Sequence, residues 1–183
     1  METDLKDLLK ASYLPQKKAE DLMSQKGYTY DKELSNMEQK VFVSPTGKPI
    51  IAERGSTRVS DWLVEDPKIL FGGGLFDSRR VSQSKQLSKA TEAKYGMSPT
   101  LVGHSLGGYL AEKGARKGSD VYTYNKASGL PSVFTSTPKS QHDYRTALDI
   151  PSALSSYQRG GERKTLAGSW NPFSSHNIKY LKV

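Results

Sequence analysis

"LVGHSLGGYLAEKGARKG", residues 101–118, passes from an apolar, strand-like run straight into a helix-like pattern. At the junction, Ser105 stands between Gly103 and Gly107. This order of strand, Gly-x-Ser-x-Gly and helix is typical of a nucleophile elbow, a strained turn that raises a serine hydroxyl above the edge of a sheet. The glycines fit such a turn because side chains two residues to either side of the serine would clash. We therefore predict that Ser105 is a nucleophile; the alternative is an ordinary glycine-rich turn.

The helix that follows Ser105 predicts where negative charge is stabilised. Free amide groups and the positive end of the helix dipole both favour an anion at a helix N-terminus. We expect the amide of Leu106 to be the first donor of an oxyanion hole, the group of donors that binds the oxygen of a tetrahedral intermediate.

A nucleophilic serine needs a base, and the chain has three histidines. His104 adjoins Ser105 and cannot fold back onto it, so we expect it to pack, to hydrogen-bond locally or to contact substrate. His142 has only Glu112 and Asp120 as acids between itself and Ser105. Glu112 falls in the elbow helix.

Asp120 begins a strand, at the end opposite to the usual active site of such sheets. The expected chain order of serine, acid and histidine then leaves His176 as the base, with Asp143 or Asp149 before it. Asp149 follows an apparent strand, where sheet-end loops carry catalytic groups, whereas Asp143 would begin that strand. We predict a triad of Ser105, Asp149 and His176. The alternatives are a helix N-cap for Asp149 and an ordinary surface histidine for His176.

Strands and helices alternate around the elbow, which predicts an α/β fold of the α/β-hydrolase kind, with a central, mostly parallel sheet flanked by helices. Residues 1–35 form an N-terminal helical segment packed on the same domain, and residues 36–183 form the hydrolase-like domain. Helices are expected at 4–26 (interrupted at Pro15), 58–65, 78–95, 105–117 and 151–157. A hairpin is expected at 40–56, strands at 68–71, 99–103, 120–125 and 143–148, a loop at 127–141, and a strand or hairpin arm at 162–168.

Three segments together, "VGHSLGGYLA", "ERGSTRVSDWL" and "ALDIPSAL", resemble the class 3 lipases, a triacylglycerol-lipase-like branch of the α/β hydrolases. The resemblance spans about residues 40–183 in the right order and leaves the N-terminal segment unexplained. It implies a Ser-Asp-His triad and an acyl-enzyme. The chain is short for that family, which favours a compact esterase or phospholipase without a large acyl tunnel.

The resemblance also implies further site residues. The segment Arg54-Gly55-Ser56 would complete the oxyanion hole, with Ser56 as the second donor beside Leu106. The segment 57–67 would carry a lid, which makes Trp62 a candidate substrate or interface contact. Burial in the core is the alternative for Trp62.

Composition narrows the classes of function. The chain has 183 residues, a net charge of +8 and no cysteine, which excludes thiolate chemistry, thiolate metal sites and disulfides. No cluster of metal ligands stands out, so we expect neither a metal nor another cofactor. The charged N-terminus lacks a signal-peptide pattern and no apolar run could span a membrane. We expect a soluble, cytoplasmic protein, although delivery in a virion or by a secretion system would fit too.

These observations leave three hypotheses. The first is a serine carboxylester hydrolase that acts on lipid-like esters. The second is a catalytically inactive binding protein that keeps the hydrolase fold, because fold does not guarantee chemistry. The third is a basic membrane-surface module that meets anionic lipids. Nucleic acid is not an expected partner, since the sequence carries no known binding module. The oligomeric state is open.

Overall fold

A computed structural model describes residues 1–56, 78–127, 139–147, 149, 162–170, 174 and 176–182. Within these ranges the strands form one seven-stranded sheet with helices on both faces. The strands are β1 (Thr29–Asp31), β2 (Gln39–Val43), β3 (Pro49–Glu53), β4 (Thr100–His104), β5 (Asp120–Tyr124), β6 (Ser140–Thr146) and β7 (Glu162–Leu166). The helices are α1 (Glu2–Tyr13), α2 (Gln16–Ser24), α5 (Ser78–Tyr95), α6 (Leu106–Gly114) and the short 3₁₀ helix η1 (Ile178–Tyr180).

The order of strands in the sheet follows the order in the chain, from β1 to β7. β1, β2 and β3 are antiparallel, and every pairing from β3 to β7 is parallel. A parallel pairing needs a crossover; α5 precedes β4, and α6 connects β4 to β5. The carboxyl ends of β3 to β7 therefore lie at one edge of the sheet, where α/β proteins place their sites.

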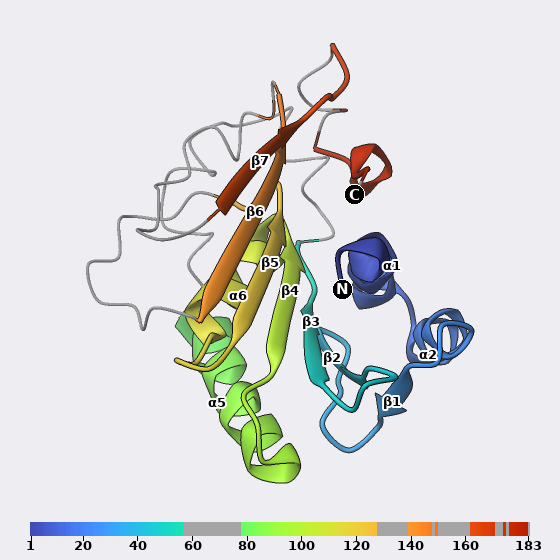
Figure 1. The fold of residues 1–183 in the computed structure, drawn as a ribbon, viewed down its shortest axis with the longest axis vertical. Coiled ribbons are helices and arrows are strands. Elements are labelled where there is room, and N and C mark those ends of the chain that lie inside the picture. The colour runs from blue at the N-terminus through green and yellow to red at the C-terminus, as the bar shows by residue number, and fades with distance from the viewer. Residues whose placement is uncertain are drawn as a thin grey trace.

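Alternate residues of the central strands face opposite sides of the sheet and build two separate cores. α1 and α2 cover one face, and α5 and α6 cover the other (Figure 1). Under α1 and α2 lie Leu5, Leu8, Leu9, Met23, Phe42, Ile50, Val102, Tyr124 and Tyr144. Under α5 and α6 lie Val41, Ile51, Leu87, Leu101, Ala111 and Val121.

The N-terminal segment is part of the sheet structure as well as of its covering. Leu5, Leu8 and Leu9 of α1 are fully buried against the central strands. After α2, β1 pairs with β2 along Thr29–Asp31 and adds the antiparallel edge of the sheet. Residues 1–35 therefore contribute two helices and one strand, where the sequence suggested helix alone.

Most predicted elements within the described ranges are present. Pro15 separates α1 from α2, and the predicted hairpin is β2–β3. The strand predicted at 143–148 begins earlier, as β6 at Ser140, because Ser140 and Gln141 pair with β5 although their side chains are polar. The segment 162–166 is a parallel strand and not a hairpin arm. The helices predicted at 58–65 and 151–157 and the strand at 68–71 lie outside the described residues.

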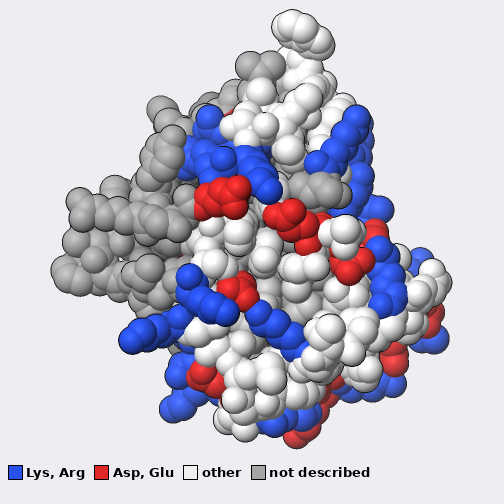
Figure 2. All heavy atoms as spheres, in the orientation of Figure 1, with Lys and Arg blue, Asp and Glu red and all other residues white. Residues whose placement is uncertain are grey.

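Charge is mixed over the surface. Figure 2 shows basic and acidic side chains interspersed on one face. Several lysines are matched by carboxylates; Lys26, for example, lies 2.9 Å from both Asp4 and Asp7. In the part of the chain that the structure describes, each helix is too short or too polar to cross a bilayer.

Candidate functional site

Ser105 lies between the end of β4 and the start of α6, in an unusual backbone conformation. Its φ is 56° and its ψ −126°, a left-handed region that a non-glycine residue rarely occupies. Neighbouring strands hold this conformation in place. The Ser105 amide donates to the carbonyl of Tyr124 (3.1 Å), and the amide of Ala127 donates to the carbonyl of Ser105 (3.1 Å). Backbone strain of this kind persists only where surrounding contacts enforce it, and it concentrates at functional sites.

The glycines beside Ser105 are explained by close approach of the backbone. A Cβ on Gly103 would lie 2.1 Å from the carbonyl oxygen of Gly107, so only glycine lets α6 fold back against the end of β4. A Cβ on Gly107 would lie 2.3 Å from the carbonyl oxygen of Glu53. The helix start is thereby packed against the end of β3 as well. The sequence expectation of crowding on both sides of the serine is met.

His176 and Asp149 meet near this turn. Nδ1 of His176 lies 2.7 Å from Oδ1 of Asp149, and both side chains are almost fully buried. Nε2 of His176 is buried and has no hydrogen-bond partner in the described parts of the chain. The His176 ring packs on the ring of His104, with centroids 4.7 Å apart. The structure thus brings a carboxylate–imidazole pair beside the residue that precedes Ser105, and leaves one imidazole nitrogen available.

His104 is occupied on both ring nitrogens. Its Nε2 lies 2.8 Å from the carbonyl oxygen of His176, and its Nδ1 lies 2.9 Å from the hydroxyl of Tyr13. A carbonyl only accepts, so Nε2 carries the proton. Burial, and then the electrostatic interaction with the neighbouring imidazole of His176, lower the pKa of His104 to about 3, which keeps the His104 ring neutral. Nδ1 therefore accepts the proton of the Tyr13 hydroxyl.

Tyr13 extends this chain of contacts to the end of β3. The hydroxyl oxygen of Tyr13 also receives the backbone amide of Gly55, and burial raises the pKa of this phenol to about 12. One tyrosine from α1 therefore connects Gly55 with His104, and through His104 with the backbone of His176. This arrangement favours local hydrogen bonding for His104 over the alternative of substrate contact, because no ring nitrogen is left for a ligand.

Asp143, the alternative acid, lies in the middle of β6 and has other partners. Its carboxylate receives Lys126 Nζ at 3.0 Å and Thr123 Oγ1 at 2.6 Å. The same lysine also binds Glu112 at 2.5 Å. Asp143 and Glu112 thus belong to a buried charge network between β6, β5 and α6, away from His176. The earlier start of β6 explains why Asp143 does not stand at a strand end.

The two expected oxyanion donors come from segments that touch. Leu106 is the first residue of α6, where an amide has no carbonyl partner within the helix. Gly107 packs so closely on the end of β3 that a Cβ there would lie 2.3 Å from the Glu53 carbonyl oxygen and 2.9 Å from the Gly55 nitrogen. The end of β3, and Ser56 after it, therefore lie at the same turn. Trp62, the remaining predicted residue, lies outside the described residues.

With this geometry in place, the whole fold can be compared with known proteins. No protein-family model matches the chain, and no curated protein matches it in sequence. Several solved structures match in three dimensions, and two of them are lipase complexes. The fold is similar to that of a lipase-complex chain. The native Rhizomucor miehei lipase propeptide complex contains a chain that matches 90% of this one with a TM-score of 0.62 and 18% identity. A deletion mutant of that complex matches 91% with a TM-score of 0.57 and 18% identity.

The likeness covers only part of the matched chains. This chain spans about two thirds of the length of the matched chains, 67% and 66% respectively. At 18% identity the likeness shows a similar α/β fold and nothing beyond the fold.

One site residue, Tyr13, is absent from the sequence expectations. It precedes Leu14-Pro15 at the end of α1, and nothing in its local pattern shows that it reaches His104, which is 91 positions away. Metal ligands were not expected. Across the described ranges, no group of three or more histidine or acidic side chains is placed to hold a metal ion.

Proposed function

We propose that this protein is a serine carboxylester hydrolase in which Ser105, His176 and Asp149 form the triad. The observation that supports this most is the buried pair of His176 and Asp149, which packs on His104, the residue before a serine in a strained strand–helix turn. The second imidazole nitrogen of His176 has no hydrogen-bond partner among the described residues. An ordinary glycine-rich turn would need neither the left-handed serine nor a buried carboxylate–imidazole pair.

The chemistry then follows from the roles of these groups. Nε2 of His176 removes the proton from the Ser105 hydroxyl as Oγ attacks the ester carbonyl, and the histidine next protonates the alcohol that leaves. Asp149 receives Nδ1–H, which fixes the tautomer and stabilises the imidazolium. The amides of Leu106 and Ser56 donate to the developing oxyanion. Water, deprotonated by the same histidine, releases the acid from the acyl-enzyme.

Lipid-like esters are the substrate class that we propose. The lipase-related fold supports it, as does the resemblance of the sequence segments around Ser56, Ser105 and Asp149.

The test is a comparison of Ser105→Ala with the wild type on p-nitrophenyl esters and on phospholipids. We expect the variant to lose at least about 10⁴-fold in kcat, because removal of a triad member leaves only oxyanion and binding contributions. Ser82→Ala, an exposed serine on α5, is the matched control and should keep full activity.

A fluorophosphonate probe separates the hydrolase from an inactive binding protein of the same fold. An activated serine reacts with the probe, so labelling of the wild type and not of Ser105→Ala supports the proposal. Equal turnover in Ser105→Ala, or a wild type that neither labels nor hydrolyses any ester, would reject it.

A further inference from the structure

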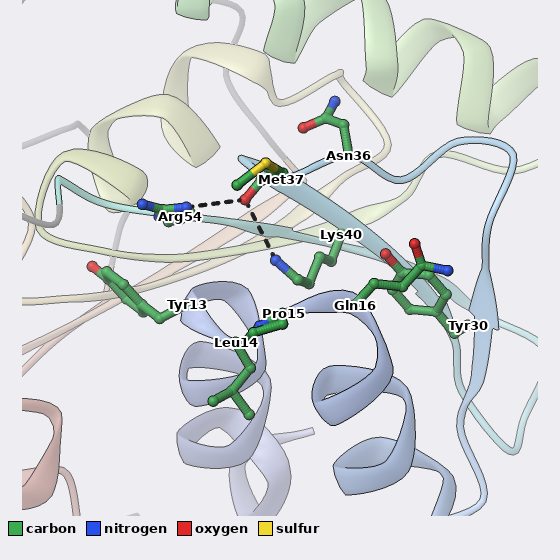
Figure 3. A pocket seen from close by; sticks show the side chains of 9 residues that line it. All are labelled: Tyr13, Leu14, Pro15, Gln16, Tyr30, Asn36, Met37, Lys40 and Arg54. Carbon is green, nitrogen blue, oxygen red and sulfur yellow. Dashed lines mark hydrogen bonds between the residues drawn. The ribbon is translucent and has the colours of Figure 1, made fainter.

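A cavity of about 420 Å³ lies where α1 meets α2, over the start of β2 (Figure 3). Residues from three places line the cavity. The two helices contribute Tyr13 and Gln16, and the segment before β2 contributes Asn36 and Met37. Lys40 comes from β2, and Arg54 directly follows β3. The candidate triad does not use this cavity.

Two cations converge inside it on one peptide carbonyl. Lys40 Nζ lies 3.5 Å from the carbonyl oxygen of Met37, and Nη1 of Arg54 lies 3.4 Å from the same oxygen (Figure 3). Lys40 also donates to the carbonyl of Ser12 at the end of α1 (2.9 Å). The two positive charges are thus held close together with only neutral acceptors between them.

This positive charge is unmatched. Lys40 is only 2% exposed. Within the described ranges, neither Lys40 nor Arg54 forms an ion pair, and none of the residues that line the cavity carries a carboxylate. The other buried lysines of the described ranges have carboxylate partners: Lys126 pairs with Glu112 and Asp143, and Lys113 lies 3.7 Å from Glu112. Burial, and then the charge of Arg54, lower the pKa of Lys40 to about 8, so the protein itself does little to stabilise this ammonium. Buried charges are ordinarily paired, so the missing partner has to be explained.

An anion in the cavity would supply that partner. The rim is suited to an apolar tail, since Met37 is 78% exposed and Leu14 and Pro15 lie beside it. Tyr13 and Arg54 also form the wall toward the candidate site, because Tyr13 binds His104 and Arg54 directly precedes Gly55 and Ser56.

We infer that this cavity is a binding site for an anionic head group, a phosphate or carboxylate, carried by a lipid-like molecule with an apolar tail. Lys40 and Arg54 bind the anion, and Met37 contacts the tail. The binding is independent of catalysis. The consequence that substrates of Ser105 include anionic lipids rests on the proposed function.

Calorimetry with the Ser105→Ala variant tests the site without any dependence on hydrolysis. The probes are octyl phosphate, octyl glucoside and inorganic phosphate, each below its aggregation concentration. We expect octyl phosphate to bind, and octyl glucoside to bind at least about tenfold more weakly, since the uncharged head group cannot pair with the two cations. Inorganic phosphate separates the two sources of the anion: binding as tight as that of octyl phosphate assigns the site to a free anion and overturns the lipid part of the inference.

Variants then locate the binding. Added to Ser105→Ala, Arg54→Gln should weaken octyl phosphate about tenfold, and about 0.5 M salt should weaken it further. Lys40→Met should act in the same direction, although it also removes a donor to the end of α1; the gentler Arg54→Gln keeps the test valid if Lys40→Met fails to fold. Lys89→Gln, which removes an exposed charge on α5, is the control and should bind as before. Unchanged affinity in Arg54→Gln, or equal binding of octyl glucoside, rejects the site.

Discussion

Ser105 depends on residues that are remote from it in sequence. His104 holds the backbone of His176 through Nε2 and receives the Tyr13 hydroxyl at Nδ1. Both contacts are buried, where a lost hydrogen bond leaves a polar atom without a partner. If His176 is the base, Tyr13 acts as a positioning residue for it, through His104 and without touching substrate.

Tyr13→Phe tests this dependence. The variant keeps the ring and removes the hydroxyl, so Nδ1 of His104 loses its donor and the His176 backbone is held less firmly. We expect kcat to fall about three- to tenfold with KM nearly unchanged, which corresponds to one hydrogen bond of about 1 kcal/mol. Steady-state kinetics and the rate of fluorophosphonate labelling measure it.

Tyr122→Phe on β5 is the matched control, because it removes a tyrosine hydroxyl for which the described ranges give no hydrogen bond. It should leave kcat unchanged. A Tyr13→Phe variant with full kcat and wild-type labelling would show that the hydrogen bond is structural only.

At this scale the order of residues along the chain predicted one pair of interacting side chains, but it could not predict contacts between distant parts of the fold. The order of serine, acid and histidine pairs Asp149 with His176, and these side chains do share a hydrogen bond. The same reasoning could not find Tyr13, whose role is set by how α1 lies on the sheet. It also left Asp143 open, since a strand that begins with polar residues has no clear start in the sequence.

Elements are joined to one another by buried polar side chains as well as by apolar ones. Glu53, at the end of β3, is completely buried; Ser84 of α5 donates to it at 2.5 Å and Gln39 of β2 at 3.1 and 3.2 Å. Burial raises the pKa of Glu53 to about 7, and the hydrogen bonds from Ser84 and Gln39 only partly offset this rise.

This carboxyl makes stability depend on pH. In the folded state its pKa lies above its ordinary value of 4.5, so the native protein binds the additional proton, and the free energy of unfolding falls as pH rises from 4.5 through about 7. Glu53→Gln removes that titration. We expect the variant to gain up to about 3 kcal/mol relative to the wild type between about pH 5 and pH 8, as measured by urea unfolding at both values.

Glu33→Gln, which removes an exposed carboxylate that is not among the charges acting on Glu53, is the control and should keep the pH dependence of the wild type. A constant difference between Glu53→Gln and the wild type at the two pH values would contradict the raised pKa.

Helices and strands that are long enough to show a regular sequence pattern could be predicted from the sequence. The eighteen residues of α5 and the hairpin β2–β3 were predictable, because few breakers interrupt the helix and turn residues separate the two strands. β1 has only three residues, Thr-Tyr-Asp, too few to show a period, and its pairing with β2 is what makes it a strand.

At the scale of the whole molecule, the N-terminal helices and the central strands of the seven-stranded sheet share one core. Leu8 of α1 is fully buried in the cluster that contains Ile50 and Val102 of the central strands. An appended segment would have its own core, whereas this one covers a face of the sheet that would otherwise expose apolar side chains to water.

Leu8→Ala therefore should destabilise the whole protein. We expect a loss of about 2–5 kcal/mol in a single urea transition, because a large cavity opens in the shared core. Thr3→Ala, exposed on the same helix, should change the free energy by less than about 0.5 kcal/mol. An unchanged main transition in Leu8→Ala, or a separate early one, would mean that α1 unfolds by itself.

The contacts of His104 with both Tyr13 and His176 also order events during synthesis. A nascent polypeptide on the ribosome exposes its serine roughly seventy positions before the imidazole that would activate it emerges from the exit tunnel. If His176 is the base, the Ser105 hydroxyl has no general base during that interval and does not react as a nucleophile. If the proposed hydrolase activity holds, the serine therefore becomes reactive only after those roughly seventy residues have followed it out of the ribosome.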